Sequence, residues 1–215
     1  MKKFLILTSL SVLSLAPSGC TTLLAACGGN LANCVSPKDA AQTQKTGEKQ
    51  QTTEKITLDK APETAPEIKS TAGRFAVVAP TTLREEARPL PTEVGNLTLN
   101  QFMGVKGTTA YIVAYTDYPE QHIQSVSSDT LLESAVSGVV QALRGNLISK
   151  TNTSLTGNPG KEFTLVAKYN GQNVTYRERA FLVKNRLYQL IATTPQGVNN
   201  PEIDSFMNSF RLLNQ

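Results

Sequence analysis

The dipeptide Asn170-Gly171 restricts the fold of this chain more than any other short segment. Both residues readily adopt positive φ, which the tightest two-residue β-hairpin turns require. Apolar and polar residues alternate over 162–169 and 172–179, as in antiparallel strands with one buried face. A register slip would move the large apolar residues off that face, so the pairing is well specified. The predicted pairs are Tyr169 with Gln172, Ala167 with Val174, Leu165 with Tyr176, and Phe163 with Glu178.

Further strands are predicted where β-branched and aromatic residues are bounded by turn residues. The first is 74–79, which ends at Pro80. Two more, 96–105 and 108–116, flank a turn at Lys106-Gly107, and 187–193 follows a turn at Lys184-Asn185. With the hairpin, these segments predict an antiparallel meander.

Two segments are predicted to be helices. The first begins with a capping box at Thr130 and Glu133 and ends before Gly145. The second begins at Asn200-Pro201, where proline suits the first helical position. Its predicted buried stripe is Ile203, Phe206, Met207 and Phe210. We therefore predict an α+β fold in which helices pack on an antiparallel β-sheet.

The N-terminal segment has the layout of an export signal. Two lysines precede the apolar run Phe4–Ala16, which is shorter than the roughly 20 residues that a membrane-spanning helix needs. Leu24–Cys27 then has the form of a lipobox, whose cysteine is acylated and becomes the new N-terminus. We predict a signal peptide over 1–26 and lipidation of Cys27, so that acyl chains anchor the protein to a membrane.

Other processing sites fit the pattern less well. Cys20 follows a segment with proline where a lipobox has a branched residue, and Cys34 follows asparagine, which is poor before a cleavage site. Cleavage after Ala26 without lipidation is a further alternative. With Cys27 at the new N-terminus, the folded part contains no cysteine, so no disulfide framework is expected.

The amino-acid composition divides the rest of the chain into a tether and one globular domain. Residues 28–70 contain few large apolar side chains and are predicted to be disordered. The organisation is therefore a lipid-anchored tether over 27–72 and a globular domain over 73–215. The chain has 21 Lys and Arg against 17 Asp and Glu, without the clustered basic stripe of a nucleic-acid-binding protein. We expect no nucleic-acid partner.

The domain resembles the PsbP-like α/β/α sandwich family, known for extrinsic proteins of photosystem II. Three segments carry the resemblance: 73–80, an opening strand that ends in proline; 160–190, a long hairpin and its returning strand; and 206–212, a terminal helix that runs into a short strand. The resemblance covers most of 73–213. It implies an α/β/α sandwich that binds partner proteins and is mostly non-enzymatic.

Residues with catalytic or metal-binding potential are few. Asp117, Glu120 and His122 would hold a divalent cation if their loop folded back, but metal sites generally draw ligands from several elements. We expect a solvated loop there, with no metal and no cofactor. A Ser-His-acid triad would have to use His122, yet the nearby serines at 125, 127 and 128 lie in no strand-turn-helix elbow.

Arginines offer the other candidate site. Arg177 and Arg179 lie on one face of the hairpin, and Arg186 lies near the next turn. These residues form either a partner-binding patch or a solvated face that Glu162 partly neutralises. Glu162 lies opposite Arg179, and an exposed pair of this kind contributes less than about 1 kcal/mol.

The leading functional hypothesis is a bacterial, plausibly cyanobacterial, lipid-anchored envelope protein that faces the periplasm or the thylakoid lumen. Its domain is expected to be a non-catalytic module that binds or assembles a partner protein. Two alternatives remain open. A small-ligand or lipid carrier would need an apolar cavity beneath the helix at 130–144, and a hydrolase would need a cleft with perturbed titratable groups.

Overall fold

The computed structural model describes residues 65–92 and 94–213. Their order is β1 Glu67–Ser70, β2 Phe75–Val78, β3 Arg84–Thr92, β4 Gly95–Lys106, β5 Thr109–Asp117, α1 Glu120–Ser125, α2 Ser128–Leu143, β6 Asn146–Leu155, β7 Asn158–Tyr169, β8 Gln172–Val183, β9 Arg186–Pro195, α3 Glu202–Ser209 and β10 Arg211–Leu212. Among these elements no helix is long and apolar enough to cross a bilayer. The signal segment, Cys20, Cys27 and Cys34 lie outside the described residues.

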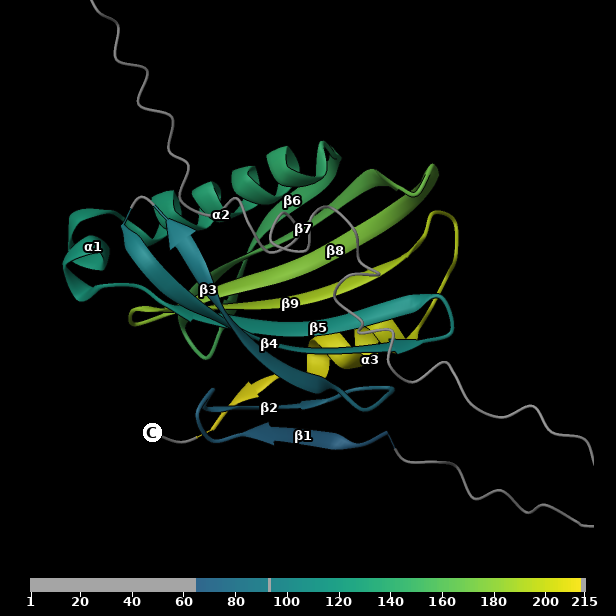
Figure 1. Ribbon diagram of the computed structural model, residues 1–215, viewed down its shortest axis with the longest axis horizontal. Coiled ribbons are helices and arrows are strands. Elements are labelled where there is room, and N and C mark those ends of the chain that lie inside the picture. The colour runs from purple at the N-terminus through teal and green to yellow at the C-terminus, as the bar shows by residue number, and fades with distance from the viewer. Residues whose placement is uncertain (1–64, 93, 214–215) are drawn as a thin grey trace, which may run out of the picture.

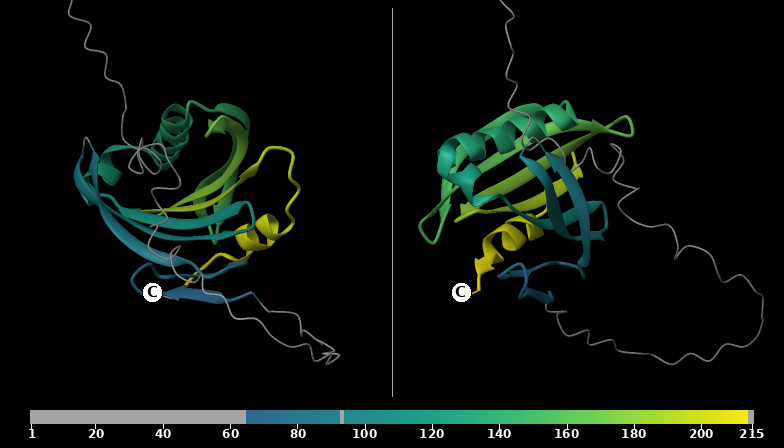
Figure 2. Two further views of the ribbon diagram at one scale, coloured as in Figure 1. Left: turned by 45° about the vertical axis from the view of Figure 1, so that its right-hand side comes forward. Right: turned by 60° about the vertical axis from the view of Figure 1, so that its left-hand side comes forward.

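The strands form two sheets, and the α+β prediction is confirmed. The larger sheet has the order β3-β4-β5-β9-β8-β7-β6, and the smaller has the order β1-β2-β10. All pairings are antiparallel. The large sheet lies in the middle: α2 covers one face, and α3 with the small sheet covers the other (Figures 1 and 2). One outer layer therefore combines a helix with a sheet.

The hairpin prediction is confirmed in detail. Asn170 and Gly171 have φ of 48° and 79°, and every predicted cross-strand pair of β7 and β8 is present. The β8–β9 turn also lies at the predicted Lys184-Asn185. The β4–β5 turn differs by one residue, because Lys106 pairs with Thr109 and leaves the loop to residues 107 and 108.

Aromatic residues fill the core between the sheet and α3. Phe75 of β2 is fully buried and stands edge-on to Phe102, with ring centroids 5.2 Å apart. It also stacks on Phe210, which follows α3. The predicted α3 stripe is confirmed, since its four residues are all buried here. The opposite core places α2 on the apolar side of β7 and β8.

The N-cap of α2 lies three residues earlier than the predicted Thr130. Ser127 is this N-cap, and the Ser127 hydroxyl accepts a hydrogen bond from Thr130 N at 3.0 Å. Glu133 forms ion pairs with Lys150 and Lys161, so the capping-box prediction is wrong. Glu133 is thus used in contacts with β6 and β7 and does not reach back to the N-terminus of α2.

Three strands lie where none was predicted. β1 falls inside the segment assigned to the tether, so the folded domain begins before residue 73. The edge strands β3 and β6 have mostly exposed side chains and therefore lack a clear alternation. Pairing with β2, β4 and β7 places them in the sheets.

Replacing Gly171 with valine should destabilise the domain by about 1–3 kcal/mol, because a β-branched residue is strained at positive φ. Gln172→Val is the matched control, since Gln172 is exposed at the start of β8. Urea unfolding of both variants measures the difference. Equal losses would contradict the turn geometry.

Candidate functional site

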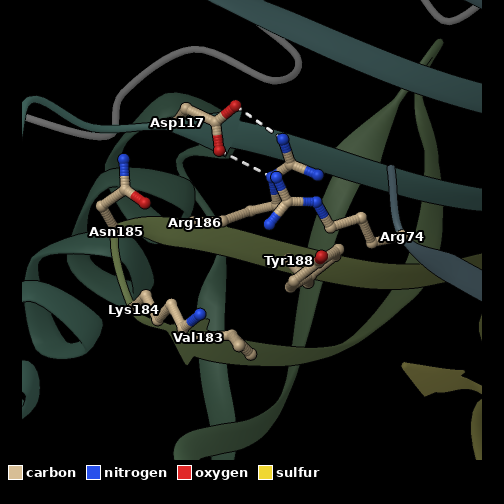
Figure 3. Close-up of a pocket in the computed structure, with 7 residues that line it drawn as sticks. All are labelled: Arg74, Asp117, Val183, Lys184, Asn185, Arg186 and Tyr188. Atoms are coloured by element: carbon tan, nitrogen blue, oxygen red, sulfur yellow. Dashed lines mark hydrogen bonds and ion pairs between the residues drawn. The ribbon is translucent and has the colours of Figure 1, made fainter. Parts of the chain in front are cut away.

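A pocket opens where the turn between β1 and β2 meets the β8–β9 turn. Its volume is about 220 Å³, and its lining residues are Arg74, Asp117, Val183, Lys184, Asn185, Arg186 and Tyr188 (Figure 3). Three of these side chains are cationic and one is anionic. The lining therefore favours an anionic ligand.

Arg186 is held rigidly in this pocket. It lies directly opposite Asp117 in the β5–β9 register, and the two form a bidentate pair with N–O distances of 2.6 and 2.7 Å. Arg186 Nη1 also donates to Ala72 O at 2.8 Å, and the guanidinium lies 4.4 Å from the centre of the Tyr115 ring. The hydrogen bond to Asp117 raises the pKa of Arg186. Its planar group is thus fixed in position before any ligand binds.

Arg74 reaches the pocket from the β1–β2 turn. Its φ is 55°, which is uncommon for a residue other than glycine or asparagine. Tertiary contacts hold the turn in place: Leu213 N donates to Arg74 O at 2.9 Å, and the Tyr188 hydroxyl donates to Gly73 O at 2.8 Å. A Cβ on Gly73 would lie 2.6 Å from the Phe75 ring, so this position requires glycine.

Arg177 and Arg179 do not form part of this pocket. The Glu162 carboxylate accepts hydrogen bonds from Arg177 Nε and Nη2 at 3.0 and 2.7 Å and from Arg179 Nε at 2.8 Å. Arg177 also pairs with Asp204 of α3, and Arg179 donates to Asn208 of the same helix. Glu162 neutralises the two arginines, as the second interpretation expected, but they are partly buried and attach α3 to the sheet.

Glu178 is a titratable group that the sequence analysis did not single out. It is fully buried on the face of the sheet beneath α2. Tyr176 Oη donates to its Oε2 at 2.5 Å, and Gln189 Nε2 donates to Oε1 at 2.8 Å. Burial raises the pKa of Glu178 from its usual range to about 7. Glu178 is packed on all sides and has no contact with solvent. Its carboxylate therefore forms hydrogen bonds within the core and does not line a surface site.

The proposed metal ligands are not brought together. Asp117 binds Arg186, whereas His122 lies in α1 and stacks on Tyr118 with ring centroids 5.9 Å apart. Glu120 begins α1, a helix where a loop was expected. Among the described residues no group of three carboxylates, histidines or cysteines is placed to hold a metal ion. Ser125 and Ser127 cap or hydrogen-bond to local backbone groups.

Of the three arginines that the sequence indicated, only Arg186 lines the pocket. Arg74 and Lys184 were missed as site residues, because the sequence assigned one to a strand and the other to a turn. Both have φ of 55°. The predicted turn at Lys184-Asn185 accounts for the positive φ of Lys184, but no local pattern indicates it at Arg74, so only tertiary contacts bring the two side chains to one site.

Comparison with solved structures finds similar folds at low sequence identity. A Bacteroides thetaiotaomicron protein matches with a TM-score of 0.45 and 11% identity; the match covers 71% of this chain but only half of that chain's length. A Pseudomonas aeruginosa protein of unknown function matches with a TM-score of 0.36 and 10% identity over 52% of this chain and 84% of its own.

A cyanobacterial PsbP from Synechocystis is also similar, with a TM-score of 0.48 and 9% identity over 68% of this chain and 91% of its own. This is the family that the sequence motifs resemble. No protein-family model matches the sequence, and no curated protein sequence matches it. None of these matches assigns an activity.

Replacing Glu162 with alanine should destabilise the domain by about 1–3 kcal/mol, between the values for exposed and buried ion pairs. The substitution leaves two partly buried guanidinium groups without their shared carboxylate. Glu67→Ala is the control, because Glu67 pairs with Lys69 and Arg211 in a more exposed setting. Chemical unfolding of the two variants should give the larger loss for Glu162→Ala, and the reverse order would argue against the attachment of α3.

Replacing Glu178 with glutamine should stabilise the domain at pH 8 more than at pH 5. The folded-state pKa is raised, so the stability that the wild-type carboxyl retains at about pH 4.5 is lost as the pH rises through about 7. Glutamine is neutral throughout and avoids this loss, which is on the order of 3 kcal/mol. Urea unfolding at both pH values, with exposed Glu120→Gln as control, measures it. A pH-independent difference would contradict the burial of an ionisable carboxyl.

Proposed function

We propose that this protein is a lipid-anchored envelope protein whose domain is a non-catalytic module that binds a partner protein. Acylated Cys27 attaches it to a bacterial membrane, and the domain acts on the periplasmic or lumenal side. The observation that carries the proposal is the Arg186 pocket, where two arginines and a lysine line a surface opening. A surface of fixed charge suits recognition, because a rigid arginine loses little conformational entropy on binding.

Several other charged side chains form ion pairs between elements of the fold and are therefore weaker candidates for a partner-binding surface. Glu162, Arg177 and Arg179 attach α3 to the sheet, and Glu133 and Lys161 connect α2 to β7. Each is engaged within the fold. The Arg186 pocket is where cationic side chains gather around an opening, so it is the surface best suited to a partner.

The packing favours a binding module over the two alternatives. Beneath α2, the buried residues Val136 and Val139 pack against Phe163 and Ile191, where a carrier would need its cavity. A hydrolase would need a cleft with perturbed titratable groups, whereas Glu178, the carboxyl whose pKa is raised, is fully buried. Neither arrangement supports small-molecule transport or hydrolysis.

Anchoring predicts a change in location for Cys27→Ala. Wild-type protein should remain with the membranes until detergent is added, because two or more acyl chains anchor a protein stably. The variant should lose metabolic labelling by a fatty acid and leave the lipid-bound fraction. Cys34→Ala is the matched control and should behave as wild type. Full lipid labelling of Cys27→Ala would refute the anchor.

Binding through the pocket predicts that a charge reversal there abolishes partner capture. The full chain is cross-linked in its native membranes, extracted with detergent and purified, and the captured proteins are compared among variants. Arg74→Glu should lose the specific partner. Lys168→Glu, an exposed cation on β7, should retain it. Identical capture by both variants would exclude the pocket as the binding site.

A further inference from the structure

We infer that the Arg186 pocket binds a carboxylate group from an acidic segment of the partner, with Arg74 as the main contact. This inference rests on the proposed function and specifies the chemistry of its partner. Arg74 and Arg186 come from segments more than 100 residues apart, and in Figure 3 their guanidinium groups lie toward one another within the same pocket. Two like charges gathered at one opening favour an anion between or beside them.

The two arginines have different roles. Arg186 already shares its charge with Asp117 and has an exposed side-chain fraction of only 14%, so it forms the fixed wall of the pocket. The Arg74 side chain is exposed, and its guanidinium makes no hydrogen bond or ion pair with any residue in 65–92 or 94–213. Its planar fork of N–H donors therefore remains available to a ligand oxygen.

The backbone holds Arg74 in an unfavourable conformation. Its φ of 55° persists because Arg74 N donates to Thr71 O at 3.2 Å and Arg74 O accepts from Leu213 N. The adjacent Gly73 is fixed by Ser70 and Tyr188. Strained residues that surrounding structure holds in place are concentrated at ligand-binding sites, and here the strained residue carries the available charge.

The size and charge of the pocket select the kind of anion. Its volume of about 220 Å³ is below the usual 300–1,000 Å³ of small-molecule sites, so it suits one acidic side chain or chain terminus. Asp117 in the wall offsets one of the three cationic side chains of the lining. The planar carboxylate matches the guanidinium geometry, and the phosphate arm of the experiment below tests the other common anion.

The pocket lies on the side of the domain away from the start of the described chain. The described chain enters at one end of β1, and the turn that carries Arg74 lies at the other end of that strand (Figure 1). The β8–β9 turn lies on this second side as well. The choice of a protein source rests on the proposed function, in which the domain binds a partner protein, and the vesicle arm of the experiment below tests a lipid source.

Isothermal titration of the full chain in neutral detergent tests the inference. The probe is an end-capped peptide with three consecutive acidic side chains, and its Asn/Gln analogue is the uncharged control. The acidic peptide should bind saturably, and the analogue should not. Arg74→Gln should weaken binding by at least about tenfold, whereas Lys168→Gln should leave it unchanged. Both variants keep the backbone conformation, since each replaces one long side chain by another.

The remaining outcomes separate this inference from the proposed function. Equal peptide binding by Arg74→Gln and Lys168→Gln would overturn it, as would Arg74-dependent binding to phosphatidylglycerol vesicles or inorganic phosphate but not to the peptide. If the native partner is lost in Arg74→Glu but the acidic peptide does not bind, the binding module stands and the carboxylate inference fails.

Discussion

The burial of the central strands on both faces is the constraint on which the rest of the structure depends. Between its two ends, every residue of β9 is buried, and β5 is buried up to Asp117. A strand that is apolar on both sides is stable only if a layer covers each side. Helix α2 provides one layer, and α3 with the small sheet provides the other. The stripe on α3 and the aromatic cluster around Phe75 are consequences of this requirement.

The pairing of strands in the large sheet also determines which charged side chains lie opposite one another. Asp117 and Arg186 face one another because β5 and β9 pair in antiparallel register at the ends of both strands. Glu162 reaches two arginines for the same reason on β7 and β8. The clusters differ in their neighbours, because Arg177 and Arg179 engage Asp204 and Asn208 of α3, whereas Arg186 lies beside Arg74 in a pocket at the ends of β5 and β9. The neighbouring segments, more than the residue type, therefore determine which arginines line a pocket.

The site was only partly predictable. Arg186 was recognised because it follows a turn, but its partner Asp117 was assigned to a loop with His122. Arg177 and Arg179 were interpreted as exposed because Asp204 and Asn208 come from a helix 27 and 29 residues further along the chain. Arg74 had no local signal. Each of these errors concerns a contact between distant segments, which periodicity within one segment does not encode.

The sequence by itself determined those elements that depend only on residues close together in the chain. The Asn170-Gly171 turn, the register of β7 and β8, and the buried stripe of α3 follow from backbone preferences and from the spacing of apolar residues. Tertiary structure alone decided the edge strands β1, β3 and β6 and the meeting of Arg74 with Arg186. These features depend on pairing and packing between segments that are far apart in the chain. The free energy of that packing exceeds the weak local preferences, and it is gained only when the two layers cover the sheet.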